Sequence, residues 1–395
     1  MAVRILPGDI GRRLLGVVWL LASYAAQAEP WTPDNDNEVI EQLTTSLFFE
    51  TTPLQQQLQT STDDPKKAAK LARQYISIGR RQSDPRYFGY AQAAIHPWQQ
   101  QAQPPSDILL IRATLKQHHH HYQAAVTDLQ KLTQSAPGNA QAWLTLSSIQ
   151  LVQGHYPQAK NSCAGLARNR SGWLSLLCYG QVMALSENAE RGYALITTLL
   201  RHIPDQDLST RQWLQTLLAE ISTREGKPQQ AEKHFKRALA IPQRDPYLLR
   251  VYSEYLRNHH RASEVLSLLK HESHDDALLL ELALAARKSG KKQQLITYKK
   301  ALKERFQAEK LRGSTLHRRE YARFLLDIEQ QDKQALTLAK ANWALQKEPA
   351  DAHLLLDAAI KNRDLDSIQT IIDWQNRFHI QDQQLRSLLN NTGIL

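Results

Sequence analysis

Residues 140–171 read AQAWLTLSSIQLVQGHYPQAKNSCAGLARNRS, and this stretch decides the fold. It repeats features found one period earlier in the chain. Tyr156 follows Tyr122 by 34 residues, and Ala159 follows Ala125 by the same interval. A fixed period of about 20–50 residues is typical of proteins built from stacked repeats. We therefore number repeat positions from Ala140 and, one unit earlier, from Ser106.

The same register continues along the chain, with further units beginning near Gln212, Pro246 and Asp276. Position 8 of each unit carries a small residue. These residues are Ala113, Ser147, Ala219, Ser253 and Ala283. Added bulk where two helices approach each other would force them apart. The pattern therefore predicts that position 8 is the closest approach between the two helices of each unit.

The unit at Ala140 has Trp at position 4, Leu at 7, Gly at 15, Tyr at 17 and Ala at 20. This pattern resembles the tetratricopeptide repeat, W-x2-L-G-x2-Y followed by A, F, A and P. The resemblance covers about residues 64–389. It implies an all-α fold, a right-handed superhelical solenoid of antiparallel helix hairpins, and binding of protein or peptide partners. Good helix formers dominate the composition, which contains only 15 Gly and 16 Pro.

These signals predict five segments along the chain. They are a signal peptide at 1–28, an N-terminal segment with a short helix at 29–63, a divergent helical hairpin with a Pro/Gln-rich connection at 64–105, the solenoid at 106–349, and a C-terminal hairpin with a capping helix at 350–395. Two places depart from the regular repeat. The segment 172–204 fits loosely, with Tyr193 where a small residue is expected, and ALTLAKANWALQKEP at 335–349 is expected to form an extended second helix.

The N-terminus has the three parts of a secretory signal peptide. Basic residues precede the apolar stretch LLGVVWLLA at 14–22, and the small residues of Ala26-Gln27-Ala28 follow it. We expect cleavage between Ala28 and Glu29 and a periplasmic or secreted protein of the exported bacterial type, with an uncleaved anchor as the alternative. No later stretch is apolar enough to span a membrane, so no transmembrane span is expected in the mature chain.

The net charge is +10 at pH 7, which favours acidic partners or anionic surfaces. Residues 299–323 hold nine Lys or Arg against three Glu. We consider this basic stretch, with Lys299, Lys300, Arg318 and Arg319, a possible site for an anionic polysaccharide or another anionic envelope component. The alternative is a solvated helix face. A nucleic-acid partner is not expected for an exported chain without a stacking motif.

Cys163 and Cys178 are the only cysteines. They lie about equally far from a predicted turn near Arg170 and Ser171, so antiparallel helices would bring them opposite each other. Export would place them in an oxidising compartment. We therefore expect a disulfide, with a pair of buried free thiols as the alternative.

Two further alternatives concern metals and catalysis. His118, His119, His120 and His121 form a run between two predicted helices, and imidazole is a good ligand for Zn, Cu or Ni. However, no Asp, Glu or Cys completes a set at ligand spacing. No cofactor is expected, and metal handling is kept as an alternative function. The sequence also lacks G-x-S-x-G, G-x-G-x-x-G and a complete phosphate-binding loop.

The sequence therefore predicts a non-enzymatic scaffold or adaptor of the cell envelope. Stacked hairpins make a concave face from the first helix of each unit, a surface suited to a peptide or a partner helix. Positions 2, 5, 9 and 12 should face this groove. In the unit at Ala140 these residues are Gln141, Leu144, Ser148 and Leu151.

Overall fold

The computed structural model describes residues 64–169, 172–311 and 317–390. The chain divides into two units, of which the second covers 57–395. Every described residue belongs to the second unit. The predicted signal peptide and the predicted short helix at 29–63 therefore lie outside the described residues.

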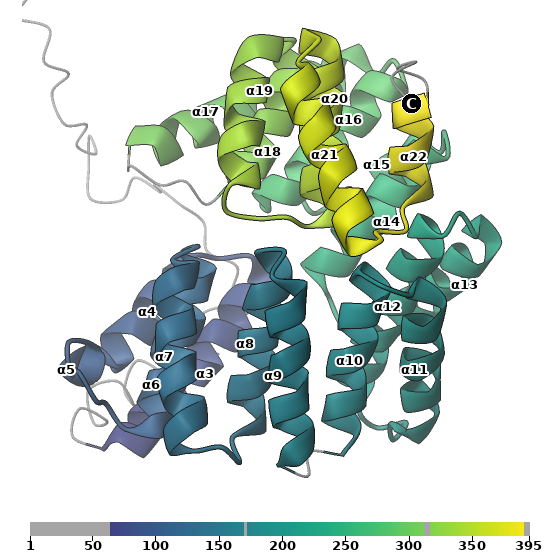
Figure 1. The fold of residues 1–395 in the computed structure, drawn as a ribbon. Helices are drawn as coiled ribbons and strands as arrows, with labels where there is room; N and C mark the ends of the chain where they lie inside the picture. The colour runs from purple at the N-terminus through teal and green to yellow at the C-terminus, as the bar shows by residue number, and fades with distance from the viewer. Residues whose placement is uncertain (1–63, 170–171, 312–316, 391–395) are drawn as a thin grey trace, which may run out of the picture. The chain divides into compact units, whose positions relative to one another are not determined.

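The described chain is all-α and consists of helices that pair in sequence order (Figure 1). The N-terminal helices are α3 (Pro65–Gln82), α4 (Arg86–Ala94) and the short α5 (His96–Gln99). The next hairpins are α6 (Ser106–His118) with α7 (Tyr122–Ser135), α8 (Ala140–Val152) with α9 (Tyr156–Arg168), α10 (Trp173–Leu185) with α11 (Ala189–His202), and α12 (Leu208–Arg224) with α13 (Pro228–Leu239). They continue as α14 (Pro246–Asn258) with α15 (Ala262–Leu268) and α16 (Asp276–Lys288) with α17 (Lys292–Leu311).

The C-terminal hairpins follow the same plan with one irregularity. They are α18 (Arg318–Phe324) and a π-helix (Leu325–Glu329) with α19 (Asp332–Trp343), then α20 (Pro349–Asn362) with α21 (Leu365–Phe378), and finally α22 (Gln383–Asn390). The π-helix ends at Glu329 and is capped by Gln330, whose φ is +57°. The predicted extension of the second helix over 335–349 is wrong, because α19 ends at Trp343. The chain then turns, and Glu348 and Asp351 form a capping box that starts α20.

Position 8 is the tight point that the repeat pattern predicted. The five small residues there are each 2% exposed or less. Ser147 shows why bulk is excluded: its hydroxyl lies 3.3 Å from the carbonyl oxygen of Ala159 and 3.5 Å from Sγ of Cys163, both on α9. The first and second helices of this unit therefore meet at Ser147.

The loosely fitting segment 172–204 is a regular hairpin whose register is displaced by one residue. Helix α10 begins at Trp173, 33 residues after Ala140, so position 8 is Gly180 and position 20 is Gly192. A Cβ on Gly192 would lie 2.7 Å from the carbonyl oxygen of Gly180 and 2.6 Å from the amide nitrogen of Ala184. The small residue expected at Tyr193 is therefore its neighbour Gly192, and α10 and α11 pack backbone against backbone.

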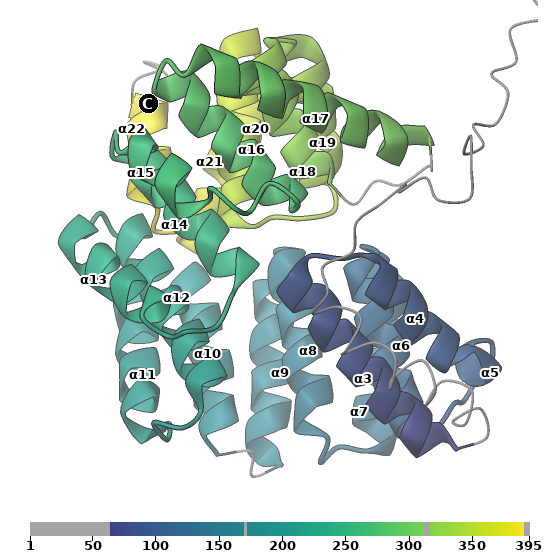
Figure 2. The same ribbon diagram turned by 180° about the vertical axis from the view of Figure 1, so that it is seen from behind.

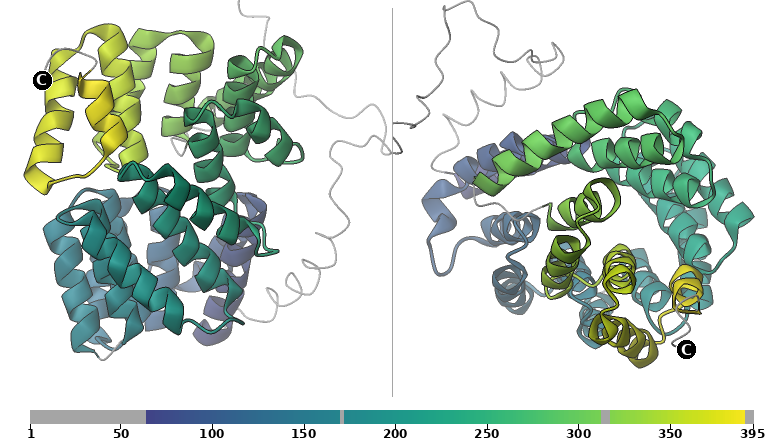
Figure 3. Two further views of the ribbon diagram at one scale, coloured as in Figure 1. Left: turned by 90° about the vertical axis from the view of Figure 1, so that its right-hand side faces the viewer. Right: turned by 90° about the horizontal axis from the view of Figure 1, so that it is seen from above.

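The C-terminal hairpins return to contact hairpins much earlier in the chain (Figure 3). The N–H of Lys347 donates to the carbonyl oxygen of Val152 at 2.6 Å, and the N–H of Glu187 donates to that of Phe378 at 3.4 Å. The Tyr156 and Phe378 rings meet edge to face with centroids 4.8 Å apart. One core cluster accordingly contains residues of α8–α10 together with residues of α16–α22.

A second return contact involves the N-terminal hairpin, which lies in front in Figure 2. The guanidinium of Arg244, in the loop before α14, donates to the carbonyl oxygen of Arg81 in α3. The same guanidinium is fixed by Glu272 at 2.6 Å. Hairpins that are distant in sequence are thus held together by polar contacts as well as by the core.

Candidate functional site

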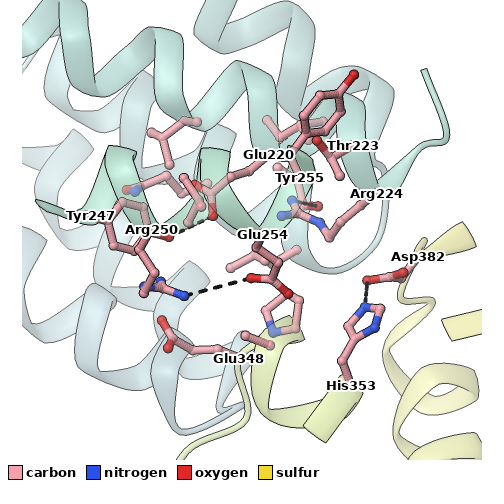
Figure 4. Close-up of a pocket in the computed structure, with 18 of the residues that line it drawn as sticks. Glu220, Thr223, Arg224, Tyr247, Arg250, Glu254, Tyr255, Glu348, His353 and Asp382 are labelled. Atoms are coloured by element: carbon pink, nitrogen blue, oxygen red, sulfur yellow. Dashed lines mark hydrogen bonds and ion pairs between the residues drawn. The ribbon is translucent and has the colours of Figure 1, made fainter. Parts of the chain in front are cut away.

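A cavity of about 270 Å³ lies where the first helices of the central hairpins face the C-terminal hairpins (Figure 4). Residues of α8, α10, α12 and α14 line one side. Residues of α18, α20 and α22, and of the segments just before α20 and α22, line the other. Its lining is rich in charged side chains. The charged lining residues are Glu220, Arg224, Arg250, Glu254, Arg319, Lys347, Glu348, His353 and Asp382.

Helical spacing explains why these side chains point inward. On α14, Tyr247, Arg250 and Glu254 are three and four residues apart and so share one face of the helix. Leu248, Tyr252 and Leu256, on the other face, are buried in the core. Asp245 caps the helix and accepts hydrogen bonds from the N–H groups of Tyr247 and Leu248. Local sequence thus fixes which face of α14 the cavity meets.

Tyr247 and Glu220 join α14 to α12 across the cavity wall. The Tyr247 hydroxyl donates to Oε1 of Glu220 at 2.7 Å (Figure 4). Burial raises the pKa of Glu220, and nearby Arg224 partly opposes this shift. Burial, followed by the charge of Glu220, also raises the pKa of Tyr247. Tyr247 nevertheless remains 43% exposed, because its accessible surface faces the cavity.

Two arginines in the wall have few partners. The Arg250 guanidinium stacks on the Tyr247 ring at 5.0 Å, and its closest carboxylate among the described residues is that of Glu254 at 4.0 Å. Arg224 donates one hydrogen bond, to the carbonyl oxygen of Ala184 at 3.2 Å. Burial acts to raise the pKa of Glu254, but Arg257 and Arg250 outweigh it and lower the pKa.

The C-terminal side of the cavity is internally paired. Arg319 contacts Glu348 at 2.8 Å and Asp351 at 3.4 Å. His353 hydrogen-bonds Asp382 at 3.0 Å, and Asp382 also caps α22 through the N–H of Leu385. Burial acts to lower the pKa of His353, but the Asp382 carboxylate outweighs it, so that the pKa is raised. These pairs hold the α18–α22 wall of the cavity in place.

A second cavity of about 520 Å³ adjoins the first. The two cavities share lining residues from α12, α14 and α20, including Thr223, Glu254 and His353. The arginines of the second cavity are more fully paired. Arg257 lies 3.0 Å from Glu281, and Arg323 lies 2.7 Å from Asp357.

The four groove residues predicted in the unit at Ala140 have two different locations. Ser148 and Leu151 line the first cavity. Gln141 is exposed and hydrogen-bonds Thr145, and Leu144 packs against the core, so neither is part of the cavity lining. The same positional rule, applied to later units, gives the residues that the sequence reasoning missed. Glu220 stands at position 9 of the unit at Gln212, and Tyr247, Arg250 and Glu254 stand at positions 2, 5 and 9 of the unit at Pro246.

The basic stretch 299–323 does not gather its four named cations into one surface patch. Lys299 pairs with Glu329 at 3.0 Å, and Arg319 belongs to the cavity network. Arg318 donates to the carbonyl oxygen of Ala341 at 3.1 Å, whereas Lys300 is exposed on α17. Helical spacing sends neighbouring residues to different faces, so a charge run along the sequence is divided in space.

The histidine run contributes to packing between hairpins. The His118 ring stacks on Phe88 with centroids 3.5 Å apart, and His120 Nδ1 lies 3.2 Å from Nε2 of Gln346. Burial lowers the pKa of His118 to about 3 and that of His120 to about 4. The centroid of the His119 ring lies 5.1 Å from that of His118 and 6.2 Å from that of His121. Within the described residues, no three His, Cys, Asp or Glu side chains are grouped to hold a metal ion.

The predicted disulfide is confirmed. Cys163 on α9 and Cys178 on α10 are bonded, with their Cα atoms 5.5 Å apart. The bond links the second helix of one unit to the first helix of the next, as the position of the turn predicted. Both side chains lie in the core cluster that also contains α20 and α21.

None of the described helices is long and apolar enough to cross a membrane. No protein-family model matches the chain, and comparison with curated protein sequences finds no match. Three solved structures show a likeness. The APC/C hetero-tetramer Cut9-Hcn1 has a TM-score of 0.43 and 16% identity over 80% of this chain. The TPR domain of P58(IPK) has a TM-score of 0.24 and 18% identity over 84% of this chain. Yeast Tom70 has a TM-score of 0.29 and 13% identity over 88% of this chain.

The chain spans 59% of the Cut9-Hcn1 chain, 97% of the P58(IPK) domain and 86% of Tom70. At these identities and TM-scores, none of the three likenesses bears on what this chain binds. The architecture follows instead from its own repeat register, helix pairing and buried small residues. In its described residues the chain is an all-α solenoid of helix hairpins, the fold that the resemblance to the tetratricopeptide repeat implied.

Proposed function

We propose that this chain is a non-enzymatic scaffold or adaptor of the cell envelope, and that it binds a protein or peptide partner through its concave face. One observation carries the proposal. Position 9 of four successive first helices lines one shared cavity, through Ser148, Gln181, Glu220 and Glu254. In the unit at Pro246, Tyr247 and Arg250 at positions 2 and 5 line it as well. Such a ladder of polar and aromatic groups suits an extended or helical segment.

The chemistry of the lining supports binding in preference to catalysis. A covalent mechanism needs a nucleophile within hydrogen-bond reach of a base. Among the described lining residues, the His353 imidazole is hydrogen-bonded to Asp382. Neither the Ser148 nor the Thr223 hydroxyl makes a hydrogen bond to this imidazole, and that of Thr223 donates to a backbone carbonyl oxygen. The carboxylates are committed mainly to Tyr247, Arg319 and His353.

The envelope location rests on residues 1–28 of the sequence. We expect exported material to begin at Glu29, which intact-mass measurement of protein from the periplasmic fraction will test. Mass corresponding to a chain that starts near Met1 would contradict cleavage. Protein found only in the cytoplasmic fraction would contradict export.

The binding face is tested by placing a photo-crosslinking amino acid at Tyr247 or Ser148, which both line the cavity, in cells that make the full chain. Gln158, exposed on the second helix α9, is the matched control. We expect one discrete adduct from a groove position and none from Gln158. The adduct should reappear with purified partner. Adducts from Gln158 alone would assign binding to the other face and overturn the proposal.

A further inference from the structure

Three cations of the first cavity lack a hydrogen-bonded carboxylate among the described residues: Arg224, Arg250 and Lys347. Arg250 approaches Glu254 only to 4.0 Å, and Arg224 donates only to a backbone carbonyl. Lys347 lies over the Trp343 ring at 5.9 Å. By contrast, Arg319 in the same cavity has Glu348 at 2.8 Å.

The guanidinium groups leave most of their hydrogen-bonding capacity unused. A guanidinium carries five N–H donors in a planar fork that fits carboxylate and phosphate oxygens. Arg224 uses one donor for Ala184, and Arg250 makes no hydrogen bond within the described chain. The Arg250 side chain is only 16% exposed, so its access to bulk water is small. Charged donors in such a position call for an acceptor.

The carboxylates of the lining do not occupy the N–H donors of Arg224 and Arg250. Glu348 and Asp382 are committed to Arg319 and His353. Glu220 and Glu254 remain for the three cations, and Glu220 already accepts the Tyr247 hydroxyl.

We propose that the first cavity binds a small anionic ligand through a carboxylate or phosphate group held by Arg224 and Arg250. The volume of about 270 Å³ is near the lower end of the range of about 300–1,000 Å³ that is typical of small-molecule pockets. A carboxylate or phosphate group would accept hydrogen bonds from the unused N–H donors. This site lies in the same cavity that carries the proposed partner-binding face, but the titration below contains no partner, so the two proposals can fail separately.

The experiment is calorimetric titration of the full mature chain with inorganic phosphate and, in a second arm, with succinate. Sodium chloride at matched ionic strength is the blank. We expect saturable binding in one arm, which identifies the group. Arg250→Gln should weaken it about 10- to 100-fold, because a hydrogen bond to a charged group is worth about 1.5–3 kcal/mol. Arg237→Gln, at an exposed position on α13 outside the cavity lining, should leave binding unchanged.

The proposal is overturned if neither anion binds saturably. It is also overturned if Arg250→Gln binds the anion as tightly as the wild type and the Arg237→Gln control do. Circular dichroism and the thermal midpoint without ligand establish that each variant is folded. If Arg250→Gln is unfolded, Arg250→Lys and Arg224→Gln replace it. The lysine variant keeps the charge but loses the planar fork, so its binding should be intermediate. Wild-type binding in both replacements would equally exclude the site.

Discussion

The backbone N–H of Lys347 donates to the carbonyl oxygen of Val152 at 2.6 Å, although the two residues are separated by 195 positions in the chain. The bond joins the segment before α20 to the end of α8. It stands at the margin of the charged cavity, whose lining includes both residues. Contacts of this kind, rather than the neighbouring-hairpin contacts of an extended array, set the geometry of the cavity.

The edge-to-face pair of Tyr156 and Phe378 should contribute to this long-range contact. We expect Phe378→Ala to lower the free energy of unfolding by about 1–3 kcal/mol, through lost burial and a lost aromatic pair. Leu365→Ala on the same helix is the control, because Leu365 is 63% exposed and should change stability by less than about 0.5 kcal/mol. Equal urea midpoints for the two variants would mean that the contact does not stabilise the fold.

Position 8 should tolerate no added bulk. Ser147→Leu should destabilise by about 1–3 kcal/mol, because Ala159 and Cys163 already lie within 3.5 Å of its hydroxyl. The same change at exposed Gln158 should cost less than about 0.5 kcal/mol. Chemical denaturation of both proteins measures the difference. A Ser147 variant as stable as the Gln158 variant would refute the repeat register.

The Cys163–Cys178 bond should stabilise the junction of two units. Closing a loop of about 15 residues is worth about 3 kcal/mol in the chain-entropy model. Reductant should therefore lower the free energy of unfolding by about 3 kcal/mol, measured as a lower denaturation midpoint. A Cys163→Ala, Cys178→Ala double variant should be insensitive to reductant. Free thiols titrating in non-reduced, unfolded wild type would show that the bond does not form.

The free energy of unfolding should decrease as the pH falls through the range in which His118 and His120 bind protons. The folded pKa of His118 is about 3 and that of His120 about 4, below the ordinary value of 6.5. The unfolded chain therefore binds more protons below pH 6.5, and stability present above that pH is lost as the pH falls towards 3. His118→Phe keeps the stack on Phe88 and removes one titrating group. Its stability should depend less steeply on pH between about 3 and 6.5; an unchanged slope would contradict the assignment.

Features that depend on local sequence spacing could be predicted, whereas features that depend on packing between distant segments could not. Ser147, Ala219 and Ser253 could be assigned to a helix crossing because repeat spacing alone places them there. The register of α10 was missed because a single-residue displacement at Trp173 moved Gly192 out of phase. The end of α19 at Trp343 depends on a tertiary contact, in which Asn342 donates to Asp351 at 2.7 Å and helps turn the chain.

The cavity was predictable in part. Helical phase gives the inward position of Glu254 or Ser148 once a unit has been recognised. That Arg250 lies opposite Glu348, or that Arg319 is paired while Lys300 is exposed, depends on the accumulated rotation of many hairpins. A small change in the angle of each hairpin adds up to a large displacement of residues several hairpins later. No local sequence pattern predicts this accumulated rotation.

The return of the chain from Lys347 to Val152 also restricts how this sequence can evolve. Open repeat arrays readily gain or lose units by duplication, because each unit contacts only its neighbours. Here a duplicated hairpin between residues 152 and 347 would carry α20 past its partner and expose the apolar surface that Phe378 and Tyr156 share. Tandem duplication within that interval should therefore be selected against.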